Sequence, residues 1–169
     1  MATQTLHPTH ADFTLPRWLI AGFICGAASV VIFHQGALAL LYALALTPSA
    51  PYPLAATQPF GVPALWSLAF WGGVWGIVLA AALARVHGAT FIVASAIFGA
   101  VLPTLVAWFI VAPLKGQPVA AGFAPTAMLI GPIVNAAWGL GTGIGLCWFG
   151  EKRGSRPDTR HVEPPPEAP

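Results

Sequence analysis

The chain has 169 residues, of which 57% are hydrophobic and only 7% are charged. A soluble domain of this length carries about a quarter charged residues, so this composition excludes an ordinary soluble domain and indicates a membrane protein. The net charge of +2 does not amount to the basic face with which a folded domain binds nucleic acid, and we expect no nucleic-acid partner.

Charged residues are almost absent from the middle of the chain. No Asp or Glu lies between Asp12 and Glu151, and the only Lys or Arg residues in that interval are Arg17, Arg85 and Lys115. A helix rises about 1.5 Å per residue, so ~20 apolar residues cross a hydrocarbon layer about 30 Å thick. The apolar stretches therefore predict an all-α fold, a polytopic transmembrane four-helix bundle with spans at residues 18–46, 62–84, 90–112 and 124–149.

The first third of the chain contains an arm, a span and a loop. Residues 1–16 are polar and lack apolar periodicity, which predicts a short flexible cytoplasmic arm. Residues 18–46 exceed the about 7–15 residues of a signal-peptide core, so we expect them to remain as the first span. Residues 47–61 contain four prolines and no charge, which favours an ordered cap against the membrane face over a helix.

The rest of the chain is divided by two short connections. A tight turn through His87 and Gly88 joins the second span to the third, and residues 113–122 join the third to the fourth. The charged, proline-rich residues 151–169 predict a disordered cytoplasmic tail. Residues 17–150 are thus the predicted transmembrane domain.

Basic residues gather on one side of the predicted membrane. One side holds only Lys115, and the other holds Arg17, Arg85, Lys152, Arg153, Arg156 and Arg160. Lys and Arg are enriched in cytoplasmic flanks, so this asymmetry predicts a multi-pass protein of the cell inner membrane with both termini in the cytoplasm.

A shift of 63 residues aligns several glycines and aromatic residues with one another. It places Gly36 on Gly99 and Trp75 on Trp138. A repeat of this kind predicts two tandem helical hairpins of the same orientation, related by an axis along the membrane normal.

Small residues recur at intervals of four in every predicted span. Lipid gives helices no hydrophobic reason to associate, so close packing through small residues is the expected source of helix contacts. The residues expected to form these packing faces are Gly22, Gly26, Gly72, Gly76, Ser95, Gly99, Gly139 and Gly143.

Polar side chains inside the spans are few, and each is a candidate site because a polar group is costly in a membrane. The candidates are His34, Gln35, Thr104, Asn135 and Thr142. One interpretation is that His34 and Gln35 bond across the bundle, with Asn135 as a partner. The other is that they line a path for a small solute, and a third is that His34 ligates haem across a homodimer.

The residues needed for familiar chemistry are missing from the spans. Without an Asp or Glu there, neither a Ser-His-Asp triad nor carboxylate coupling to protons or sodium can form. Cys25 and Cys147 lack the paired spacing of metal or redox sites, which predicts that they are apolar core residues. We therefore expect no enzyme activity, no metal and no cofactor.

The segment Phe33-His34-Gln35-Gly36 and the stretch from Phe60 to Gly76 carry a resemblance to known sequences. They resemble segments of small bacterial inner-membrane proteins with four spans and no assigned function. The resemblance covers the first two spans and implies a bacterial inner-membrane location, with no activity.

These features together favour a non-catalytic accessory, assembly or structural component of the inner membrane. Its expected partners are the lipid bilayer and either a second copy or another membrane protein. The alternative is a passive channel or small-solute permease lined by His34, Gln35 and Asn135.

Overall fold

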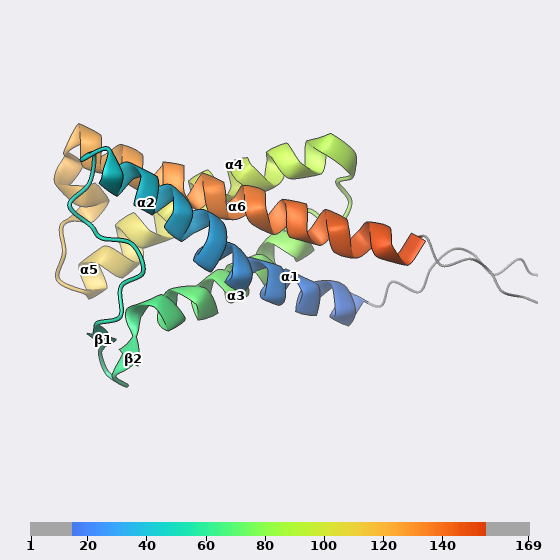
Figure 1. Ribbon diagram of the computed structural model, residues 1–169, viewed down its shortest axis with the longest axis horizontal. Coiled ribbons are helices and arrows are strands. Elements are labelled where there is room, and N and C mark those ends of the chain that lie inside the picture. The colour runs from blue at the N-terminus through green and yellow to red at the C-terminus, as the bar shows by residue number, and fades with distance from the viewer. Residues whose placement is uncertain (1–14, 155–169) are drawn as a thin grey trace, which may run out of the picture.

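The computed structural model describes residues 15–154, and these form a helical bundle (Figure 1). The first membrane-length helix comprises α1 (Leu15–Ser29), a π-helical turn η1 (Val30–His34) and α2 (Gln35–Ala43), and the second is α3 (Ala64–Ala82). The third comprises α4 (Gly88–Val106), a π-helical turn η2 (Ala107–Val111) and α5 (Ala112–Leu114), and the fourth is α6 (Pro125–Gly154). The connections contain the short strands β1 (Ala56–Thr57) and β2 (Val62–Pro63) and the 3-10 segment η3 (Val119–Phe123).

Four helices among the described residues are long and apolar enough to cross a membrane, as predicted. They are Leu15–Ala43, Ala64–Ala82, Gly88–Leu114 and Pro125–Gly150. Large apolar side chains also cover the outside of the bundle, where Ile24, Ile97 and Leu129 are all more than half exposed. Such a surface is stable against acyl chains and not against water, so the chain is an integral, multi-pass membrane protein.

The first helix begins and ends three residues earlier than predicted. Its end is fixed by backbone hydrogen bonds from Leu46 N to Leu41 O and from Ala45 N to Tyr42 O, both 2.9 Å. Ala45 adopts a φ of 55°, so the chain leaves the helix through a left-handed residue. The residues that follow are apolar in sequence but no longer helical, which is why hydropathy placed the boundary too late.

The two ends of the predicted transmembrane domain also differ from the structure. Leu15 and Pro16, assigned to the arm, already belong to α1, because proline is tolerated in the first turn of a helix. Residues 151–154, assigned to the tail, continue α6. The rest of the predicted arm and tail lies outside the described residues.

The helices pair as two antiparallel hairpins, α1 with α3 and α4 with α6. Contacts between α1 and α6 join the hairpins, whereas α3 and α4 meet only sparsely. The first and the last described residues lie at the same end of the bundle (Figure 1). The fold is therefore an all-α four-helix bundle of two tandem hairpins with the same orientation.

The repeat between the hairpins has a different register from the one predicted. The offset of 63 does relate the second helices, since Gly72 and Asn135 occupy equivalent contacts. The first helices are instead related by an offset of 73, which places Gly26 on Gly99, while Gly36 has open space around it. The cause is the connection at residues 44–63, which is ten residues longer than the one at 115–124.

Candidate functional site: polar contacts between the spans

Trp138 on α6 is the centre of the buried polar contacts between the two hairpins. Its indole Nε1 donates a hydrogen bond to the carbonyl oxygen of Gly26 on α1, at 2.9 Å. Its own carbonyl oxygen accepts bonds from the hydroxyl of Ser29, at 2.7 Å, and from that of Thr142, at 2.8 Å. All three side chains are buried, so the bonds to Gly26 and Ser29 tie α1 to α6 where no water competes for them, while the Thr142 bond lies within α6.

The first hairpin is held by backbone contact at glycines. A Cβ atom built on Gly22 would lie 2.6 Å from the carbonyl oxygen of Gly76, and one on Gly26 would meet the carbonyl oxygen of Gly72. These distances are too short for any other residue, so the predicted packing residues of α1 and α3 lie directly against each other.

The second hairpin repeats this contact with two polar substitutions, Ser95 in place of Gly22 and Asn135 in place of Gly72. A Cβ on Gly99 would meet the carbonyl oxygen of Asn135, and one on Gly139 would meet that of Ser95. Gly143 also faces Ser95. The Asn135 amide Nδ2 donates to the hydroxyl of Thr104 at 2.9 Å, so this pair lies within the hairpin.

The four alternating glycines of α6, from Gly139 to Gly145, contact two neighbouring helices. Gly139 and Gly143 face α4, whereas a Cβ on Gly141 would meet Phe33 and the Ser29 hydroxyl of α1, and one on Gly145 would meet Cys25. Residues two apart on a helix point to nearly opposite sides, so this alternation lets α6 approach both helices closely.

Gln35 is a fully buried polar side chain in the second half of the first helix, and it contacts the long proline-rich connection. Its Oε1 accepts a hydrogen bond from the backbone N–H of Tyr52 at 2.6 Å. Its Nε2 lies 3.4 Å from Nδ1 of the half-buried His34, a long contact in which the imidazole nitrogen is the acceptor. Further bonds from Ala64 N to Ala55 O and from Leu65 N to Pro53 O complete the ordered cap.

The predicted polar candidates thus fall into three separate groups. His34 and Gln35 contact the connection, Thr104 and Asn135 contact each other, and Thr142 belongs to the Trp138 network. Asn135 therefore has Thr104 as its bonding partner, and Gln35 has Tyr52. Among the side chains of residues 15–150, no buried nitrogen or oxygen lacks a hydrogen-bond partner.

Sequence reasoning missed Trp138 and Ser29 as polar contact residues. Neither residue is among the polar candidates predicted from the sequence, and Trp138 enters the sequence pattern only as one half of the repeat. The available signal was a tryptophan in the middle of a span, since a buried indole N–H needs an acceptor.

Metal-ligating side chains do not gather in the part of the chain that is described. No group of three His, Cys, Asp or Glu residues there lies close enough to hold a metal ion. In comparisons with known proteins, no family model matches the chain, and no curated protein or solved structure shows significant similarity to it.

Proposed function

We propose that the protein is a non-catalytic accessory, assembly or structural component of a bacterial inner membrane, with both termini in the cytoplasm. The observation that carries this proposal is the Trp138 network, which occupies the contact between the hairpins with buried, mutually satisfied groups. A bundle whose polar groups bond to one another is suited to being a scaffold rather than a reaction site.

The apolar outer surface of the bundle includes a face suited to packing against a helix of a partner protein. On α3, the aromatic residues Trp66, Phe70 and Trp71 are all more than half exposed. Aromatic side chains provide large, rigid contact areas for another helix, and the bilayer accommodates them in its absence. We place the partner helix, from a second copy or from another membrane protein, on this face.

A photo-crosslinking experiment in native membranes tests this proposal. A photoreactive amino acid replaces Trp71 on the aromatic face in one variant and Leu129 on α6 in a control variant. We expect a discrete adduct of protein size from position 71 and none from position 129. Lipid adducts alone from both positions, together with purification as a monomer without partners, would contradict the proposal.

The permease alternative receives less support from the same geometry. A path lined by His34, Gln35 and Asn135 requires these side chains to share one cavity, but Gln35 bonds to Tyr52 and Asn135 to Thr104. Solute flux in proteoliposomes decides between the two. Flux that is present in the wild type and falls in both His34→Ala and Asn135→Ala would favour the permease.

A further inference from the structure

A cavity of about 580 Å³ lies at the end of the bundle where the described chain begins and ends. Its walls come from the start of α1, the turn between α3 and α4, the first turn of α4 and the last turns of α6. The wall residues that matter here are Leu15, Trp18, Ala84, His87, Phe91 and Cys147. This volume lies within the range of about 300–1,000 Å³ that is typical of ligand pockets in proteins.

The lining is mainly apolar and is fixed in place. The Trp18 indole Nε1 donates a hydrogen bond to the carbonyl oxygen of Ala80 at 2.9 Å, and its ring packs against Phe91 with centroids 6.2 Å apart. The cavity is therefore walled by ordered aromatic side chains at the level where the spans end. Its chemistry suits a hydrocarbon chain.

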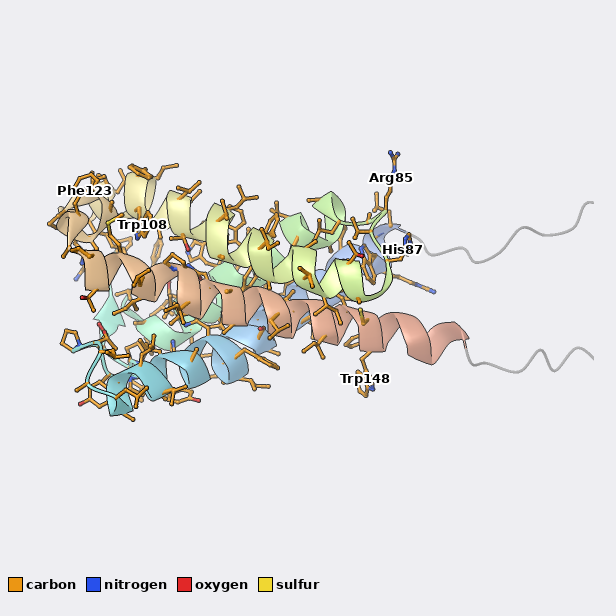
Figure 2. All side chains as sticks on the ribbon, turned by 90° about the horizontal axis from the view of Figure 1, so that it is seen from above. Arg85, His87, Trp108, Phe123 and Trp148 are labelled. Carbon is orange, nitrogen blue, oxygen red and sulfur yellow. The ribbon has the colours of Figure 1, made fainter. Side chains whose placement is uncertain are left out.

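The residues beside this cavity carry positive charge. Arg17 adjoins Trp18 in the sequence and Arg85 adjoins Ala84, and both arginines are exposed. Figure 2 shows Arg85 and His87 at the same end of the bundle, with the Arg85 side chain extending away from the helices. No Asp or Glu lies between Arg17 and Gly150. Glu151 follows the wall residue Gly150 directly, but Lys152 and Arg153 come next, so the sequence at this end is net positive, whereas the opposite end of the bundle carries only Lys115.

We propose that this cavity binds an anionic phospholipid. One acyl chain occupies the apolar space beside Trp18 and Phe91, and the headgroup phosphate lies between Arg17 and Arg85. The start of α4 adds to the attraction, since no side chain caps it and its first residue, Gly88, lines the cavity. The proposal is independent of whether the protein has a protein partner.

Native mass spectrometry of the delipidated protein in detergent tests whether binding depends on the charge of the lipid headgroup. Phosphatidylglycerol and phosphatidylethanolamine with identical acyl chains are titrated separately. We expect phosphatidylglycerol to bind more tightly, and Arg17→Gln and Arg85→Gln each to weaken it about fivefold, as expected for one basic residue near an anionic lipid. Lys115→Gln, which removes the same charge at the opposite end, is the matched control and leaves the affinity unchanged.

The acyl-chain site has its own test. Ala84→Trp fills the cavity and should weaken the binding of both lipids. Should that variant fail to fold, brominated phosphatidylglycerol, added at one lipid per protein, provides a second readout. It quenches tryptophan fluorescence, and this quenching should be smaller in Trp18→Phe. Equal affinity for the two lipids, an equal effect of Lys115→Gln, or quenching unaffected by Trp18→Phe would each overturn the proposal.

Discussion

The indole nitrogen of Trp138 on α6 donates a hydrogen bond to the carbonyl oxygen of Gly26 on α1, across 2.9 Å. Gly26 is also the residue whose missing side chain allows α3 to approach, since a Cβ there would meet the carbonyl oxygen of Gly72. Gly26 therefore lies where α1, α3 and α6 meet. Trp75, which aligns with Trp138 at an offset of 63, likewise reaches the other hairpin and packs edge-on against Phe98 on α4, with ring centroids 6.1 Å apart.

Replacing Trp138 with Phe should loosen the contact between the hairpins. The substitution keeps an aromatic ring and removes the N–H donor, and interhelical hydrogen bonds in membranes contribute about 0.6–2 kcal/mol. We expect a lower thermal unfolding temperature in detergent. The control is Trp71→Phe, an exposed position, which should leave that temperature unchanged. Equal unfolding temperatures for the two variants would contradict the role assigned to the indole.

Gly26→Ala and Gly99→Ala should each destabilise one hairpin by about 1–3 kcal/mol, because the added methyl group forces two backbones apart. Gly36→Ala is the matched control. Gly36 lies in a helix with no neighbour within 4 Å, so alanine should be neutral or should stabilise by up to about 1 kcal/mol. Reversible unfolding in mixed micelles measures all three. A cost at Gly36 equal to that at Gly26 would refute the assignment of the packing faces.

Ala45→Gly should stabilise the protein by about 1 kcal/mol, because a left-handed backbone penalises a side chain. The third helix ends in the same arrangement, with bonds from Gln117 N to Ala112 O and from Gly116 N to Pro113 O, and there the left-handed residue is Gly116, with a φ of 66°. Gly116→Ala should therefore destabilise the protein by a similar amount. Opposite shifts of the unfolding midpoint are the expected result, and shifts of the same sign would contradict it.

Gln35→Leu should release the connection between the first two spans. The backbone N–H of Tyr52 would lose its acceptor, and a hydrogen bond of about 1–2 kcal/mol corresponds to roughly 5–30-fold faster amide exchange at that residue. Gln117→Leu, at an exposed glutamine in the other connection, should leave Tyr52 exchange unchanged. Hydrogen exchange resolved at Tyr52 measures the effect, and an unaltered rate in Gln35→Leu would remove the anchoring role of Gln35.

The orientation rests on the distribution of basic residues. With Arg17 and Arg85 on one side and Lys115 on the other, a reporter fused after Pro169 should be active only in the cytoplasm. A reporter fused in the connection near Gly116 should be active only on the far side. The reverse pattern would invert the proposed topology.

The sequence by itself determined the number of spans and the class of fold. Long acid-free apolar stretches have one stable environment, and in that environment the backbone must satisfy its own hydrogen bonds as helix. The spacing of glycines likewise indicated where the helices approach, because only small residues permit backbone contact.

The tertiary structure alone decided which faces meet and which polar groups pair. Gly141 and Gly145 face α1 while Gly139 and Gly143 face α4, a division that depends on the rotation of α6 within the bundle. Gln35 bonds to Tyr52 because an intervening helix end and a left-handed Ala45 turn the chain back. Such pairings join residues distant in sequence, and hydropathy, which is a property of each segment separately, contains no information about them.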